Sequence, residues 1–326
     1  MFLKNNFSKA RPGDYIVTMF NKSFTVLHIF SKEDDSLIIE EVTVPVHKFP
    51  KGRPSSWNHW YKEGAEHHTS WVMYDVDLSS AKIREYYSFS RKGWLELNDT
   101  DSIFSTLLSL PFELVEKKNR RKQGPPPAPG DLDRRSIWNP RMIVNGGKID
   151  NVLFNAWKTR WPKDGSDLAG KLIQIYLPEE SNIYPSYYPY WLQVQDTLGI
   201  AKVRVVDSGN NLKSPMKALP RRPPEILNHG EYTDEGLRIT FKSPAYYKEF
   251  ILLALPDKNL YKHPIPLKCE TIREKRNSSA AVFTSFEELE SKLAKHEYYR
   301  FLIIPKEYDE VWVETSKSLI WPPPTR

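Results

Sequence analysis

Cysteine is almost absent from the sequence, and long apolar runs are absent altogether. Because Cys269 is the single cysteine, neither an intramolecular disulfide nor a zinc site built from several cysteines can form. No run of about 18 apolar residues occurs, so we expect no transmembrane segment. The first residues also lack the apolar segment of a secretory signal. We therefore expect a cytoplasmic chain if Met1 is native, and an exported one if a signal peptide has been removed.

Glycine is also scarce, with 14 residues against 26 prolines, while aromatic residues make up 13% of the chain. Proline interrupts helices and central strands, so this many prolines predict numerous short elements joined by fixed turns. Charged residues at 27% and hydrophobic residues at 40% are typical of a folded globular protein. The composition favours a mainly β fold, and a net charge of +6 is too small at this length to indicate an anionic partner.

Alternating apolar residues indicate a series of strands in the first ninety residues. Short β-branched and aromatic stretches, separated by polar turns, occur at residues 14–20, 23–30, 37–44, 72–78 and 81–89. Such a series is typical of an antiparallel meander. We expect it to form a curved antiparallel sheet with one covering helix, within a fold that is mainly β with some α+β character.

Two helices are expected. The first spans residues 101–110, where an apolar stripe follows a cap at Asp99 or Asp101. The second lies near the C-terminus and begins with a capping box formed by Thr284 and Glu287. The first helix is the one expected to cover the N-terminal sheet.

Two proline-rich connectors divide the chain into predicted domains. An antiparallel β domain spans residues 1–218 and is interrupted by a basic connector at 117–136. A second connector, residues 219–225, is expected to be a linker to a smaller domain at 226–326. That last domain combines strand-like runs with one helix, so we expect an α+β or sandwich-like arrangement.

Enzyme motifs are missing from the chain. Residues 161–178 contain the spacing of a phosphate-binding loop, from Gly165 to Gly170 and Lys171. A P-loop continues with Ser or Thr and then a helix, whereas here Leu172 opens a strand-like run. We interpret the glycines as part of a hairpin or loop, and we expect no cofactor. No nucleophile elbow occurs either, so a binding protein is expected rather than an enzyme.

Two aromatic-rich segments are the candidate contact surfaces. Tyrosine and tryptophan offer large contact areas at a low cost in conformational entropy, and loops on a rigid sheet often carry binding sites. The alternative is that these rings are buried and anchor their own loops. The candidate ligand-binding or partner-binding residues are Trp57, Trp60, Trp71, Tyr184, Tyr187, Tyr188, Tyr190 and Trp191.

Three histidines in the first aromatic segment give an alternative function. His59, His67 and His68 carry the imidazoles that zinc binds, and such a site would make the chain a metal-dependent hydrolase. Their spacing matches no standard metal motif, and neighbours such as His67 and His68 point to opposite sides of a strand. The simpler interpretation is a polar loop, residues 57–71, that its tryptophans hold against the edge of the sheet.

Runs of basic residues give a second alternative, binding of RNA. They occur at residues 117–122, 134–135, 221–222 and 273–276. Phosphate groups attract such runs, but no RNA-binding signature accompanies them and acidic residues are interleaved throughout. Solvated connectors are the simpler interpretation.

Four short segments carry a resemblance to a known group of proteins. They are "TSWVMYDVDL", "WPKDGSDLAGK", "PYWLQV" and "VVDSG", within residues 69–209. Through them the chain resembles uncharacterised β-rich proteins of chlamydia-type bacteria, a group that implies no activity. More loosely, a meander covered by one helix is similar to the half-barrel of lipoprotein carriers. That likeness implies an apolar groove between helix 101–110 and the sheet.

The expected function is therefore non-catalytic binding in an exported or envelope-associated setting. The expected partner is an apolar ligand or another protein, and the metal-dependent hydrolase and the RNA-binding protein are the alternatives. A fold by itself does not determine which of these applies.

Overall fold

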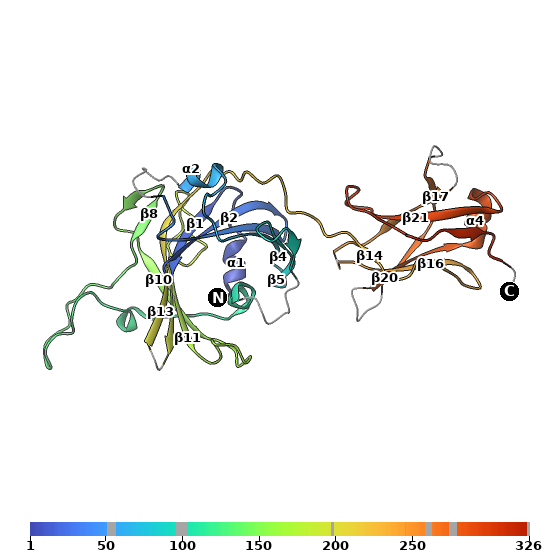
Figure 1. The fold of residues 1–326 in the computed structure, drawn as a ribbon. Coiled ribbons are helices and arrows are strands. Elements are labelled where there is room, and N and C mark those ends of the chain that lie inside the picture. The colour runs from blue at the N-terminus through green and yellow to red at the C-terminus, as the bar shows by residue number, and fades with distance from the viewer. Residues whose placement is uncertain are drawn as a thin grey trace. The chain divides into compact units, whose positions relative to one another are not determined.

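The computed structural model describes residues 1–50, 57–95, 103–196, 199–244, 246–257, 263–273 and 279–324. The chain divides into two compact units, Met1–Leu219 (unit 1) and Pro220–Arg326 (unit 2), and each is described by itself (Figure 1). Antiparallel strands dominate both units, which confirms the expected mainly β fold. Among the described residues, no helix is both long enough and apolar enough to cross a membrane.

Unit 1 is built on one large sheet, whose described strands follow the order β6-β5-β4-β3-β2-β1-β13-β12-β11-β10-β7. In chain order these strands are β1 (Tyr15–Phe20), β2 (Ser23–Glu33), β3 (Ser36–Pro45), β4 (Ser70–Asp77), β5 (Lys82–Ser88), β6 (Gly93–Trp94), β7 (Glu113–Leu114), β10 (Phe154–Arg160), β11 (Leu172–Pro178), β12 (Trp191–Asp196) and β13 (Gly199–Gly209). The meander expected in the first ninety residues forms one half of the sheet. β1 joins it to the second half by pairing with both β2 and β13.

Short helices and one hairpin lie on this sheet. They are α1 (Leu3–Phe7), α2 (Trp57–Lys62), α3 (Ile103–Ser109), the 3-10 turn η1 (Lys117–Asn119), and the paired strands β8 (Met142–Val144) and β9 (Gly147–Ile149). The helix expected at 101–110 is present as α3, and its expected caps lie outside the described residues. α2 corrects the expectation of a loop at 57–71, because three of its six residues are buried aromatic rings that fix the turn against the sheet.

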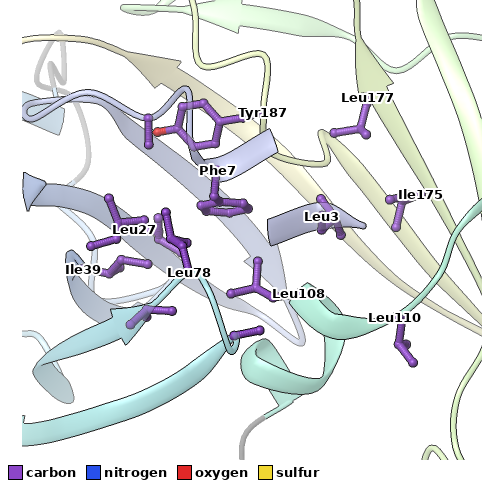
Figure 2. Close-up of a cluster of buried hydrophobic side chains, with 14 of the residues drawn as sticks. Leu3, Phe7, Leu27, Ile39, Leu78, Leu108, Leu110, Ile175, Leu177 and Tyr187 are labelled. Atoms are coloured by element: carbon purple, nitrogen blue, oxygen red, sulfur yellow. The ribbon is translucent and has the colours of Figure 1, made fainter. Parts of the chain in front are cut away.

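The first core of unit 1 lies between the sheet and the helices α1 and α3. Leu3 and Phe7 of α1 and Leu108 of α3 point into it (Figure 2), and the Phe7 ring lies 5.5 Å from that of Phe104. Full burial of such a side chain stabilises a fold by about 1.5–3 kcal/mol. The sequence did not predict α1, which packs beside α3 where the apolar groove was expected.

Alternation along the strands gives unit 1 a second core on the other face of the sheet. In β3, Leu37 and Ile39 enter the first core, while Val42 and Val44 enter the second together with the aromatic rings of α2. The sheet is therefore covered on both faces in this region.

A buried polar network lies inside the second core. The His28 side chain is 3% exposed, with Nδ1 3.1 Å from Glu40 Oε2 and Nε2 3.1 Å from the carbonyl oxygen of Leu212. Glu40 Oε1 accepts hydrogen bonds from Trp71 Nε1 at 2.7 Å and from Ser214 Oγ at 2.9 Å. Both carboxylate oxygens thus have partners, as a fully buried carboxyl group requires.

Unit 2 consists of two sheets around one core. One sheet has the order β14-β16-β20-β19, with β15 beside β16, and the other has the order β18-β17-β21-β22, with β23 beside β21. The elements are β14 (Glu225–Ile226), β15 (Glu231–Tyr232), β16 (Gly236–Lys242), β17 (Phe250–Pro256), β18 (Ile265–Leu267), β19 (Glu270–Arg273), β20 (Ser279–Ser285), α4 (Phe286–Lys292), β21 (Glu297–Pro305), β22 (Val313–Glu314) and β23 (Leu319–Trp321). Phe241, Leu252 and Phe301 meet in the shared core, so the unit is a sandwich of two sheets.

The second expected helix is present but begins one residue later than predicted. Ser285 is its N-cap, and the Ser285 hydroxyl accepts a hydrogen bond from the backbone N–H of Glu288 at 3.3 Å. Thr284 instead lies within β20 as a buried residue. The predicted capping box of Thr284 and Glu287 is therefore wrong, because Thr284 pairs with Leu237 in the sheet.

Candidate functional site

The three tryptophans of the first aromatic segment are core residues. Trp57, Trp60 and Trp71 are 7%, 6% and 2% exposed. Trp60 Nε1 donates to the carbonyl oxygen of Glu66 at 3.1 Å, and Trp71 Nε1 donates to the buried Glu40. This corrects the expectation of an exposed contact surface, because rings of this size gain more from burial than from a position in a solvated loop.

The second aromatic segment is also largely internal. Tyr187 and Tyr190 are buried, and the Tyr190 hydroxyl donates to Ser208 Oγ at 2.9 Å. Tyr184, Tyr188 and Trp191 are partly exposed and pack on the cores of unit 1. The segment is held on the sheet by its own rings, which was the alternative interpretation.

The structure does not assemble a metal site from the three histidines. His59 lies on α2, while His67 is exposed and pairs with Glu66 at 3.4 Å. His68 turns to the Ala65 carbonyl oxygen, 3.0 Å from its Nδ1. In the part of the chain that the structure describes, no group of three His, Cys, Asp or Glu side chains could hold a metal ion. The hydrolase alternative therefore has no metal centre at these residues.

Residues 120–138, which include most of the predicted basic connector, project from unit 1, and we call them the arm. Figure 1 shows it as the teal and green excursion that reaches away from the sheet of unit 1. Arg120, the first residue of the arm, anchors it to the sheet and is only 9% exposed. Its guanidinium donates to the carbonyl oxygens of Val115 and Phe154, at 3.0 and 2.9 Å, and to Asn155 Oδ1 at 3.0 Å. A cation expected to be solvated thus serves as a structural anchor.

The stem of the arm is a short two-stranded ladder. The backbone N–H of Trp138 donates to the Arg121 carbonyl oxygen at 2.8 Å, and that of Gln123 donates to the Ser136 carbonyl oxygen at 2.9 Å. The Arg121 guanidinium also lies over the Trp138 ring, 4.5 Å from its centroid. This stacking adds a cation–π contact to the ladder.

A carboxylate closes the stem. Asp133 binds Lys122 Nζ at 2.8 Å and Arg135 Nε at 2.9 Å, and these two cations hold the pKa of Asp133 well below its usual range. Arg135 also donates to the carbonyl oxygen of Gly124 at 3.0 Å. These contacts therefore join the two strands of the stem next to the tip.

The tip of the arm, residues 124–132, is exposed at every position. It reads Gly-Pro-Pro-Pro-Ala-Pro-Gly-Asp-Leu, and Leu132 is 78% exposed. Proline fixes its own φ near −65° and drives the preceding residue toward extended backbone. The sequence therefore favours a polyproline II conformation for residues 125–129, held out in solvent by the stem.

Most of the basic residues in and near the arm are engaged within the protein. Arg120 is an anchor, Arg121 stacks on Trp138, and Lys122 and Arg135 share Asp133. Lys118 pairs with Glu116 at 2.9 Å. Of the predicted run at 273–276, residues 274–276 lie outside the described residues. Fewer charges remain for phosphate groups than the sequence indicates.

A cavity of about 820 Å³ opens at the base of the arm. Arg121, Trp138, Arg141 and Lys148 are among the residues that line it, and Lys148 Nζ pairs with Asp150 at 2.5 Å. The cavity is lined by an aromatic ring and by more basic than acidic side chains. It can therefore accept an acidic side chain next to the arm.

The comparisons with known proteins agree with the resemblance found in the sequence. A sequence model of the CT021 protein family matches residues 25–150, less than half of the chain. This part of the chain is similar to the CT021 protein. The arm lies within the residues that match the CT021 family, and the match confirms the expected likeness to uncharacterised β-rich proteins of chlamydia-type bacteria.

A solved structure also matches. It is that of the hypothetical protein CT021 from Chlamydia trachomatis, 18% identical in sequence, with a TM-score of 0.49. The match covers 68% of this chain and 98% of that protein. No curated protein matches the chain.

The sequence indicated this segment but not its course. Residues 117–136 were expected to be a connector between strands, because a basic and proline-rich composition is typical of linkers. In the structure the two ends of the arm lie side by side, because Lys122 and Ile137 form a β-bridge. The signal that could have indicated this was the pair of basic residues on each side of the prolines with Asp133 between them.

Proposed function

We propose that the chain is a non-catalytic binding protein that inserts the tip of its arm into a groove on a partner protein. The observation that carries this proposal is the proline-rich tip, exposed along its whole length at the end of an anchored stem. Proline-rich segments bind other proteins with little loss of conformational entropy, because proline has already restricted the backbone.

The chemistry of the arm defines the partner. Polyproline II segments bind in grooves lined by aromatic side chains, so the partner groove is aromatic. Leu132 adds an apolar side chain at the end of the tip. Arg141 lines the cavity at the base of the arm, so we expect an acidic group on the partner surface beside the groove.

Two observations favour a protein partner over the other ligands considered. The connector cations that would bind RNA are engaged with Asp133, Trp138 and backbone carbonyl groups. The helix α1 packs beside α3, where an apolar ligand was expected. The envelope-associated setting stays a prediction, which fractionation of the host cell tests.

The test begins with a photo-crosslinking residue in place of Leu132, introduced into the full chain in its host. The crosslinked protein is identified and purified, and its affinity for the chain is measured by calorimetry. We expect the double variant Pro126→Gly/Pro127→Gly to bind it at least about tenfold more weakly, since the flexible tip must be ordered on binding.

A matched control separates the arm from proline content in general. Pro162→Gly changes another exposed proline, in the loop before β11, and this variant should bind the partner as the wild type does. Equal affinity of all three proteins would show that the tip does not bind the partner. Crosslinking that yields no protein adduct would contradict the proposal in the same way.

A further inference from the structure

A second cavity of unit 1, about 520 Å³, lies between the segment that follows α1 and the loop that follows β11. Its volume is in the range of small-molecule sites. The residues that define its chemistry are Lys9, Arg11, Asp14, Lys32, Tyr187 and Asn210. None of them belongs to the arm, and only Tyr187 is among the contact residues expected from the sequence.

Direct contacts hold the two walls of this cavity together. Lys9 forms an ion pair with Glu180, and Arg11 Nη2 donates to Asn182 Oδ1 at 3.2 Å. Asn210 Nδ2 donates to the backbone carbonyl oxygen of Asn182 at 3.5 Å. The loop is thereby tied to the residues after α1, so the cavity is formed before any ligand arrives.

A glycine brings the floor of the cavity close to β13. Gly13 has a φ of 90°, which favours glycine, and a Cβ atom there would lie 3.2 Å from the backbone nitrogen of Asn211. The backbone N–H of Leu212 also donates to the Gly13 carbonyl oxygen at 2.9 Å. This close approach places Asp14 beside the residues that follow β13.

The floor contains buried polar groups that the protein leaves incomplete. Asp14 is 5% exposed, and its Oδ2 accepts a hydrogen bond from the backbone N–H of Arg11 at 3.0 Å. Tyr187 is 3% exposed, and its hydroxyl lies beside Asp14 without a hydrogen bond of normal geometry. In the described part of the chain, neither this hydroxyl nor Asn210 Oδ1 has a hydrogen-bond partner. Buried polar atoms are nearly always paired, so these atoms indicate a position for an external donor or acceptor.

The rim of the cavity carries a surplus of positive charge. Lys32 donates to the carbonyl oxygen of Ser8, and Arg11 donates to a neutral amide, so within the described residues neither cation forms an ion pair. Burial raises the pKa of the Asp14 carboxyl group, because it disfavours the charged form. An anionic group at the rim would therefore be attracted to Arg11 and Lys32.

We infer that this cavity is a binding site for a small anionic sugar. The hydroxyl groups of the sugar would bind Asp14, Asn210 and Tyr187 at the floor. Its anionic group would bind Arg11 and Lys32 at the rim, while Tyr184 and Pro185 supply an apolar wall. Sugars suit such a floor because each hydroxyl both donates and accepts a hydrogen bond.

The experiment uses the full chain and glucose 6-phosphate as the probe, with binding followed by calorimetry. We expect a Kd of about 1 mM or tighter, and an affinity for glucose or inorganic phosphate at least about tenfold weaker. Binding of inorganic phosphate as tightly as the sugar phosphate would overturn the proposal, because the site would then recognise only the anion. Equal affinity for glucose would overturn it as well, and so would no binding of the probe.

Two variants place the ligand in this cavity. Lys32→Met should weaken the binding of glucose 6-phosphate about tenfold, while Lys202→Met, an exposed lysine on β13, should leave it unchanged. Tyr187→Phe should weaken binding several-fold and leave the unfolding temperature the same or higher, since it removes an unpaired hydroxyl. If Tyr187→Phe lowered the unfolding temperature without changing affinity, the hydroxyl would be structural and the site would not be the one described.

Discussion

Two kinds of segment in unit 1 have compositions that suggest a contact surface, but one kind is largely buried and the other is exposed to solvent. The tryptophans of 57–71 and two of the four tyrosines of 184–191 are buried, whereas the prolines of the arm tip are exposed. The reason is chemical. A large ring is stabilised by burial, while a run of prolines lacks the N–H groups that would let it pair within a sheet.

The largest expected effect comes from deleting a ring on the buried side of this comparison. Trp71→Ala removes the indole from the second core and its hydrogen bond to Glu40, so we expect a loss of about 3–5 kcal/mol in the free energy of unfolding. Urea unfolding measures it. Phe20→Ala, at a ring that is 42% exposed at the end of β1, is the control and should cost far less. Equal losses would mean that the two positions do not differ in burial.

The anchor of the arm should come next in size. Arg120→Met keeps the apolar part of the side chain but leaves the carbonyl oxygens of Val115 and Phe154 without their donor. We expect this to lower the free energy of unfolding by about 1–3 kcal/mol. Hydrogen exchange should also speed up at the backbone N–H groups of Gln123 and Trp138, which close the stem. Lys118→Met, at a solvated ion pair, should change neither quantity. Unchanged exchange in the Arg120 variant would mean that the stem does not depend on this anchor.

How much of the fold follows from the sequence differs between the sheet and the helices. The alternation in residues 14–89 predicts β1 to β5 because every second side chain must enter a core. The five-residue α1 has no side-chain hydrogen bond at its N-cap and too few residues for a helical pattern, so only its contacts with the rest of unit 1 account for it. α2 was missed for a related reason, since its rings are fixed by a core that forms from distant strands.

The candidate sites were harder to predict than the fold. The exposure of an aromatic ring depends on which residues pack against it, and those residues come from other parts of the chain. Tyr187, for example, meets Phe7 at a ring distance of 5.0 Å across 180 positions of sequence. The second cavity depends on similar long-range contacts, such as that of Arg11 with Asn182. The proline-rich tip could be found from composition alone, because its exposure follows from residues 124–132 themselves.

A smaller effect should appear in the pH dependence of stability, where a partly buried carboxyl group of the sheet contrasts with one on the arm. Burial raises the pKa of Glu41, whereas Lys122 and Arg135 lower that of Asp133. Glu41 therefore favours the folded state most below its unfolded pKa, and this contribution is lost as the pH rises through the folded pKa. Glu41→Gln should gain stability relative to the wild type between about pH 4 and about pH 8.

Urea midpoints at the two pH values measure this change. Glu33→Gln, at an exposed position on β2, should show the same pH dependence as the wild type. If Glu41→Gln did so too, its carboxyl group would titrate as it does in the unfolded chain, and the contrast with Asp133 would disappear. The Asp133 contribution has the opposite sign, since it is present above the unfolded pKa and lost as the pH falls.

The smallest effect is expected at the tip of the arm. Pro126→Ala removes only solvent-exposed atoms, so the free energy of unfolding should change by less than about 0.5 kcal/mol. Pro189→Ala is the matched change at a buried proline of the 184–191 segment, and it should cost about 1 kcal/mol or more through lost packing. Urea unfolding of both variants compares the two directly. A substantial loss at Pro126 would mean that the tip packs against the protein, and a segment that stabilises its own fold in this way would not be free to enter a partner.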